Sequence, residues 1–184
     1  EIKLNKNLKH IWVESEYLYG IEESKRFVVY KISNLTKVER IGEVNFLGAA
    51  TDLQIKDNVA IILAHSKGWN QFYAIDLTNP SAPSISDSTG LIDGRWHSKF
   101  YFDGRNIYSA GSAINPSNNK YEKWLEHFEL QQGKFVSQSQ QVNPVKDAVE
   151  DFEVIKVSGK TFLFFAIGKS GFVAYEWQKD FKNR

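Results

Sequence analysis

A four-residue pattern recurs four times along the chain, and it constrains the fold more than any other feature. A large apolar residue, a charged residue, an apolar residue and a polar residue follow one another as YKIS at 30–33, IDLT at 75–78, FELQ at 128–131 and YEWQ at 175–178. The copies start 45, 53 and 47 residues apart, close to the roughly 40–50 residues of one β-propeller blade. Alternating apolar and polar side chains are typical of half-buried strands. The sequence therefore predicts four similar β-sheet modules.

Two further β-rich runs precede each copy of the pattern. The first runs lie at 11–13, 53–55, 100–102 and 152–155, and the second at 17–19, 59–63, 107–108 and 162–165. Three of the four turns between them contain Gly, Asn or Asp, which tolerate the positive φ of tight hairpins. A fourth strand is predicted at 37–45, 82–87 and 134–140 in the first three modules. Residues 120–130 also show some helical spacing, but the pattern at 128–131 favours a strand there.

The last module leaves no room for a fourth strand, whereas residues 1–6 (EIKLNK) alternate apolar and polar side chains. We therefore expect one all-β domain, a four-bladed β-propeller closed by the N-terminal strand, which completes the last blade. The expected blades span approximately residues 7–46, 47–90, 91–142, and 143–184 together with 1–6. A closed ring of this kind leaves only short, protected strand edges.

Composition excludes several classes of function. The chain has no Cys, which excludes disulfides, cysteine metal sites and thiol nucleophiles. Its 23 basic and 22 acidic residues give a net charge of +1, so no whole-domain attraction to nucleic acid is expected. No run of 18 apolar residues is present, and no membrane span is expected. We recognise no catalytic or cofactor-binding motif, and predict neither catalytic residues nor a cofactor.

A polar pair stands directly before the first strand of each module, at residues 9–10, 51–52, 97–98 and 150–151. In a propeller the first strands line the central channel, so these pairs should ring its mouth. The candidate ligand-binding residues are His10, Asp52, His97 and Asp151. If they converge, they could hold a cation, a water cluster or a polar ligand, and whether a metal binds is left open. The alternative is that they only solvate the channel mouth and cap strands.

The connections between second and third strands are the other candidate site. Residues 64–70 form one such loop, and residues 112–123 form the longest. Because Trp and Tyr are enriched at binding hot spots, we predict a partner-binding surface with His65, Trp69, Trp96, Asn118 and Trp124. The alternative for the tryptophans is packing between blades.

Residues 72–83, FYAIDLTNPSAP, resemble the LVIVD-type propeller repeat, which carries an apolar strand, then Asp, a small residue and an Asx-Pro turn. The other three modules lack the Asn-Pro turn. The resemblance implies a binding or scaffold role, often on the bacterial cell surface, and it carries over no catalytic residue. The compartment is left open, with a periplasmic or extracellular location slightly favoured. The absence of Met, also at position 1, suggests a processed or excised chain.

Three hypotheses for function follow. The leading one is a non-catalytic binding module, a soluble monomer that binds a protein partner through one propeller face, as inhibitor or immunity-type proteins do. The second is a propeller that binds a small ligand or metal, or a hydrolase or lyase, with its site at the channel mouth. The third is a fragment of a larger surface propeller protein.

Overall fold

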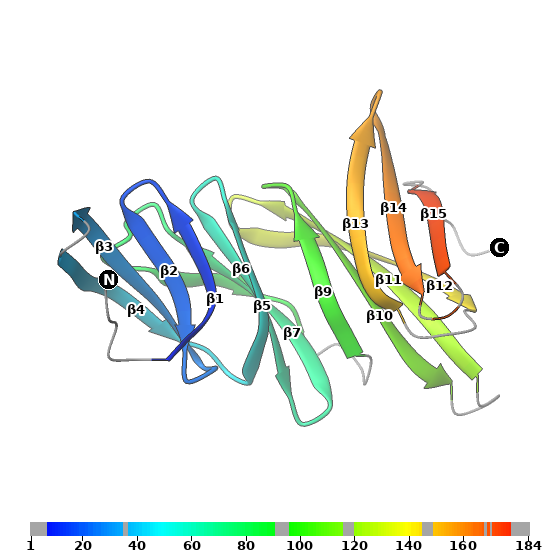
Figure 1. Cartoon of the computed structure of the whole chain (residues 1–184), viewed down its shortest axis with the longest axis horizontal. Coiled ribbons are helices and arrows are strands. Elements are labelled where there is room, and N and C mark those ends of the chain that lie inside the picture. Colours follow the sequence, from blue (N-terminus) through cyan, green and yellow to red (C-terminus); the bar gives the residue numbers. More distant parts are fainter. Residues whose placement is uncertain are drawn as a thin grey trace.

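The computed structural model describes residues 7–34, 37–90, 96–115, 120–144, 149–167, 169 and 171–177. These residues form four antiparallel sheets (Figure 1). Within the described ranges no α-helix occurs, and hence none that is long and apolar enough to span a bilayer. The predicted all-β fold is confirmed.

Each sheet is a meander in which strands adjacent in sequence pair with one another. The first sheet contains β1 (Leu8–Glu14), β2 (Tyr17–Glu22), β3 (Arg26–Asn34) and β4 (Lys37–Asn45). The second contains β5 (Ala49–Lys56), β6 (Val59–Ser66), β7 (Trp69–Asp76) and β8 (Ser84–Ser88). The third contains β9 (Trp96–Phe102), β10 (Asn106–Asn115), β11 (Lys120–Gln131) and β12 (Lys134–Pro144). The fourth contains β13 (Val149–Val157), β14 (Lys160–Ile167) and β15 (Gly171–Trp177).

Local sequence accounts for these hairpins. The β5–β6 turn is made by Asp57 and Asn58, both with positive φ (53° and 59°), the conformation that two-residue hairpin turns require. Residues 37–45, predicted as a fourth strand, form β4, and residues 120–130 lie within β11 rather than in a helix.

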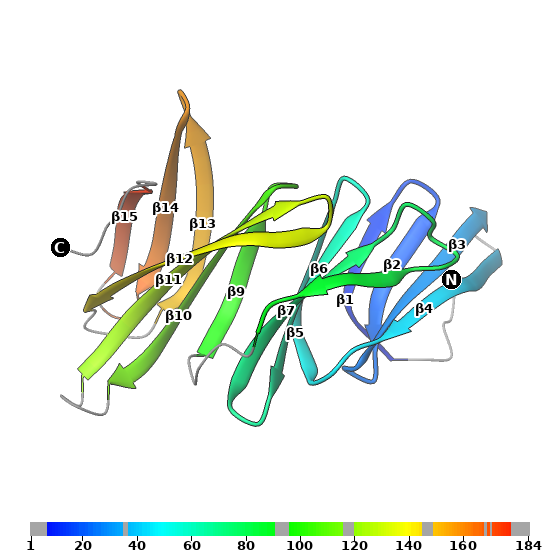
Figure 2. The ribbon, with the colours of Figure 1, turned by 180° about the vertical axis from the view of Figure 1, so that it is seen from behind.

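The four sheets lie side by side in sequence order, as both views show (Figures 1 and 2). The first strands β1, β5, β9 and β13 contact one another from each sheet to the next, and the outer strands β8 and β12 are also in contact. The first and last sheets lie at opposite ends of the row (Figure 1). The predicted closure falls on residues 1–6, which lie outside the described residues, so the closed four-bladed ring stays a prediction.

The hydrophobic core is divided among the three junctions between sheets, with one apolar cluster at each. In the middle junction Phe72 of β7 packs against Phe100 and Phe128 of the third sheet, with ring centroids 5.5 and 5.2 Å apart. Each interior sheet therefore buries both of its faces. Because one sheet alone cannot remove its apolar surface from water, neighbouring sheets stabilise one another.

Polar side chains also tie neighbouring sheets together. The Gln54 side chain of β5 accepts a hydrogen bond from the Phe102 N–H of β9 at 2.9 Å and donates one to the Phe100 carbonyl. At the outer strands, Ser86 Oγ donates to the Gly133 carbonyl at 2.8 Å, and the Phe135 N–H donates to the Asp87 carboxylate at 2.9 Å. These contacts set the position of the third sheet relative to the second.

Candidate functional site

The pairing of every first strand shifts register near its start. The shifts lie between Lys9 and Trp12 in β1, between Ala50 and Asp52 in β5, opposite Ala110 and Gly111 in β9, and between Val149 and Asp151 in β13. Irregular pairing of this kind re-aims side chains. His10, Asp52, Lys99 and Asp151 lie at or directly after these shifts, one in each sheet.

These four side chains form a ladder of alternating charge across the row, which we call the charge ladder. Lys99 Nζ lies 2.9 Å from the Asp151 carboxylate, and this contact raises the pKa of Lys99 and lowers that of Asp151. Burial raises the pKa of Asp52, although hydrogen bonds from the backbone of Leu53 and Phe100 and the charges of His10 and Lys99 partly offset this effect. Asp151 and, to a smaller extent, Asp52 raise the pKa of Lys99, whose strand lies between theirs in the row.

The charge ladder links three of the four predicted ligand-binding residues, His10, Asp52 and Asp151, through Lys99. The side chain of His97 lies outside the described part of the structure. Sequence reasoning missed Lys99, although its place two residues after His97 in the same strand was a usable signal. Among the described residues, no group of three His, Asp or Glu is arranged to hold a metal. The charges largely satisfy one another, and a ligand at this position stays a prediction.

The same end of the second sheet carries two exposed apolar side chains, Leu47 (78% exposed) and Trp69 (39%). Trp69 follows a tight turn in which Lys67 and Gly68 have positive φ. The Tyr73 hydroxyl donates a hydrogen bond to the Leu47 carbonyl at 3.2 Å. Both side chains are thus presented by ordered backbone.

Among the other predicted partner-binding residues, His65 lies beside Trp69's strand, with its Nδ1 3.3 Å from Asn70 Oδ1. The side chains of Trp96 and Trp124, and all of Asn118, lie outside the described residues. Sequence reasoning missed Leu47, which belongs to no repeated pattern and is recognisable only by its exposure.

A pocket of about 380 Å³ opens between the third and fourth sheets. Its walls come from the β9–β10 and β13–β14 hairpins and from β11 and β15. The pocket is lined by polar and aromatic side chains, among them those of Asn106, Tyr108, His127, Lys156, Lys160, Glu176 and Trp177. Tyr108, His127 and Trp177 pack as an aromatic trio, with ring centroids 4.8 to 5.7 Å apart.

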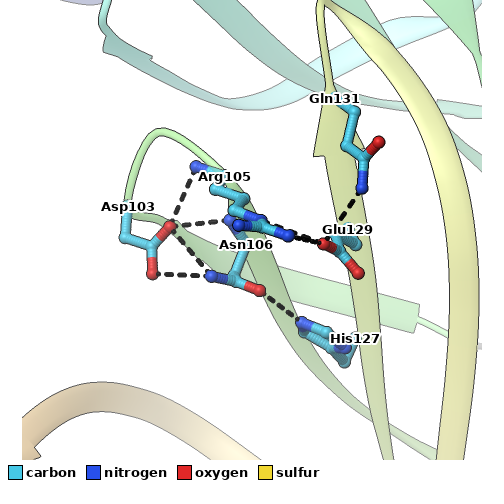
Figure 3. A network of polar contacts seen from close by, with 6 residues as sticks. All are labelled: Asp103, Arg105, Asn106, His127, Glu129 and Gln131. Carbon is cyan, nitrogen blue, oxygen red and sulfur yellow. Dashed lines mark hydrogen bonds and ion pairs between the residues drawn. The ribbon is translucent and has the colours of Figure 1, made fainter. Parts of the chain in front are cut away.

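A polar network anchors one wall of this pocket (Figure 3). The Asp103 carboxylate accepts hydrogen bonds from the N–H groups of Arg105 (2.9 Å) and Asn106 (2.6 Å), and from Lys156 across the junction. Burial by itself would raise the pKa of Asp103, but these hydrogen bonds outweigh it and lower the pKa. The Asn106 side-chain oxygen lies 2.9 Å from His127 Nε2, so it accepts a hydrogen bond from the N–H of that nitrogen and orients the ring.

Charges in the pocket are balanced. Lys156 pairs with Asp103, and Lys160 Nζ lies 3.0 Å from Glu176. Burial raises the pKa of the Tyr108 phenol above its ordinary value. Polar groups around aromatic rings suit a neutral ligand with both hydroxyls and an apolar face. Sequence reasoning had interpreted residues 103–106 only as a turn and missed the pocket, whose lining residues come from five strands of two different sheets.

Comparisons with known proteins bear on the fold. No protein-family model matches the chain, and no curated protein does. Among solved structures, it is similar to the computationally designed Ika4 protein, with a TM-score of 0.58 and 13% identity over 95% of this chain and 92% of that chain. The computationally designed Ika8 protein gives a TM-score of 0.49 and 7% identity over 92% of this chain and 58% of that chain, so this chain spans little more than half of Ika8. At such identities the likeness to Ika4 concerns the fold alone.

Proposed function

We propose that the chain is a non-catalytic binding module whose four sheets act as propeller-type blades and which binds a protein partner through the end of the blades that carries Leu47 and Trp69. The observation that carries this proposal is the exposure of these two side chains, 78% and 39%. The sheet that presents them buries both of its faces against neighbours. Rigidly held, exposed apolar side chains are suited to act as anchors in an interface.

The charge ladder lies at the same end of the sheets as Leu47, because its member Asp52 is near the start of β5, shortly after Leu47. A partner docking there would meet apolar anchors beside fixed charges of both signs, and charge patterns contribute to specificity. The resemblance of residues 72–83 to the LVIVD-type repeat also supports a binding or scaffold role. The hydrolase or lyase alternative has less support, since the ladder's carboxylates have cations beside them.

Affinity measurements on a purified partner test this proposal. A protein captured by the immobilised chain from its native host is purified and titrated against wild type, the Leu47→Ala/Trp69→Ala double variant and a Val136→Ala control, which changes a half-exposed side chain of β12. We expect the double variant to bind at least tenfold more weakly, about 1.4 kcal/mol, and the control to bind as wild type does. Equal affinity of wild type and the double variant would refute the proposal.

A second candidate function, binding of a small neutral polyol, is favoured by the pocket between the third and fourth sheets. Its volume of about 380 Å³ lies in the range of small-molecule sites. Saturation-transfer NMR with glucose, galactose and mannose as probes tests it. We expect transfer from wild type and from Trp69→Ala, and weaker transfer from Trp177→Leu and Lys160→Met. The absence of transfer to all three sugars would exclude this candidate.

A further inference from the structure

The last sheet has three strands, whereas each of the other three sheets has four. In those sheets the fourth strand, β4, β8 or β12, pairs antiparallel with the third strand, β3, β7 or β11. The third strand of the last sheet is β15, and among the described residues no strand pairs with its outer edge. The backbone N–H and C=O groups along this edge can therefore accept a further strand.

The repeated four-residue pattern shows what accompanies a fourth strand in this chain. Its first residue in the four-stranded sheets is Tyr30, Ile75 or Phe128, and these side chains are 7%, 0% and 2% exposed. In the third sheet, Phe135 of the fourth strand packs on Phe128, with the ring centroids 5.9 Å apart. The equivalent residue of the last sheet, Tyr175, is only half-buried. A fourth strand beside β15 would complete its burial.

The strand β15 also has few of the features by which natural edge strands avoid pairing. Proline, lysine and bulges protect such edges, but the sequence of β15, GFVAYEW, contains neither Pro nor Lys. The pairing of β15 with β14 runs from Gly171 to Trp177 without a register shift. Its one charged residue, Glu176, already pairs with Lys160. A regular and mostly apolar edge of this kind is suited to accept an extended peptide as an added strand.

We propose that a protein partner supplies the fourth strand of the last sheet, as an extended segment that pairs antiparallel with β15 and carries apolar side chains at alternate positions. The repeat indicates this chemistry, because β12 fills the same place in the third sheet and packs Phe135 against the core. One side of the added segment packs on Tyr175, and its backbone completes the hydrogen bonding of β15. The edge belongs to a different sheet from Leu47 and Trp69, so the inference goes beyond the proposed partner-binding surface.

The N-terminal segment of the chain itself is the alternative occupant of this edge. The strand β1, which follows that segment, belongs to the first sheet, at the opposite end of the row from β15 (Figures 1 and 2). Six extended residues reach at most about 22 Å, whereas three junctions between stacked sheets span about 30 Å at roughly 10 Å each. In this arrangement residues 1–6 are too short to cross the row and also pair along β15, which favours a strand from a partner.

Hydrogen exchange in the presence of synthetic peptides tests the proposal. The probes have the sequences of β4 and β12, which are fourth strands of this chain. With saturating peptide we expect about tenfold slower exchange in β15, because its edge gains hydrogen bonds, and no change in β6. An N-methylated β12 peptide keeps the side chains but loses backbone donors, and this matched control should leave exchange unchanged. If neither probe slows exchange in β15 at millimolar concentration, the proposal fails.

Two variants separate this edge from the proposed partner-binding surface. Tyr175→Ala should bind the β12 peptide about fivefold more weakly, whereas the Leu47→Ala/Trp69→Ala double variant should bind it as wild type does. Circular dichroism verifies that both variants fold. If β15 is already protected in the free chain and deletion of residues 1–6 removes that protection, the chain supplies its own strand. If a doubled mass on a sizing column accompanies the protection, a second copy supplies it, and either result would overturn the proposal.

Discussion

Gly42 of β4 shows how closely neighbouring sheets approach at single residues. A Cβ placed on it would collide with the Pro80 carbonyl and lie 2.6 Å from Pro83 Cδ. Both obstacles belong to the turn before β8, in the next sheet. Space rather than backbone conformation therefore requires glycine here.

We predict that Gly42→Ala lowers the free energy of unfolding by about 1–3 kcal/mol, because overpacking forces the two sheets apart. Urea denaturation measures the loss. Gly90→Ala is the control, since a Cβ at Gly90 meets nothing within 4 Å. Equal stability of the two variants would show that the 80–83 turn moves away without cost.

Asp103 carries the clearest pH dependence at the scale of one residue. Its pKa is lowered from the ordinary 3.8 by hydrogen bonds, that of Lys156 foremost, against the opposing effect of burial. A carboxyl with a lower pKa in the folded state stabilises the fold above its unfolded pKa, and the contribution is lost as pH falls below about that value.

We therefore expect Asp103→Asn to lower the free energy of unfolding by about 1 kcal/mol at pH 7. Between pH 5 and pH 3 this variant should lose less stability than wild type. Melting temperatures across this range measure both effects. Lys156→Met removes the partner cation and should change the acid dependence in the same direction. An unchanged acid dependence in both variants would contradict the assigned role.

Among the elements, β5 and β9 meet at a junction where one side chain replaces a missing strand pairing. The Gln54 side chain accepts a hydrogen bond from the N–H of Phe102 and donates one to the carbonyl of Phe100. These backbone groups belong to the first strand of the third sheet, which has no pairing partner on this side. The amide thus extends hydrogen bonding from one sheet to the next.

We predict that Gln54→Met destabilises the fold by about 1–3 kcal/mol, because it preserves side-chain length but leaves two polar backbone groups unsatisfied. Gln131→Met is the control, since Gln131 is exposed and its side chain bonds Glu129 at 3.3 Å. Chemical denaturation compares the two. If Gln54→Met loses no more stability than Gln131→Met, water takes over the two hydrogen bonds of the Gln54 amide.

At the scale of the whole molecule, stability is shared unequally along the row. The second sheet buries residues on both faces, whereas the last sheet contacts a neighbour through one face only. In stacked modules stability is approximately a sum of terms from each module and each junction. An end module with one junction therefore opens more readily than an interior one.

Hydrogen exchange on the wild-type chain should accordingly show most protection in β6 and least in β14 and β15. Mass spectrometry of peptides from each strand measures the difference. Uniform protection in all four sheets would contradict stability that depends on neighbouring junctions.

The local pattern of residues was sufficient to predict the strands and their order. The apolar, β-rich runs at residues 53–55 and 59–63, with Asp57 and Asn58 between them, predicted the β5–β6 hairpin, because strand propensity and turn conformation are properties of a few adjacent residues. The choice of strand for 120–130 was right for the same reason. The positions of His10, Asp52 and Asp151 at the starts of first strands also followed from this pattern.

Only the tertiary structure decided which side chains meet across sheets. Lys99 between Asp52 and Asp151, the exposure of Leu47, and the pocket around His127 each depend on how one sheet lies on the next, and side-chain contacts between modules leave no periodic trace in the sequence. Strand period thus specified the four sheets, while the packing of one sheet on another placed the charges and the pocket.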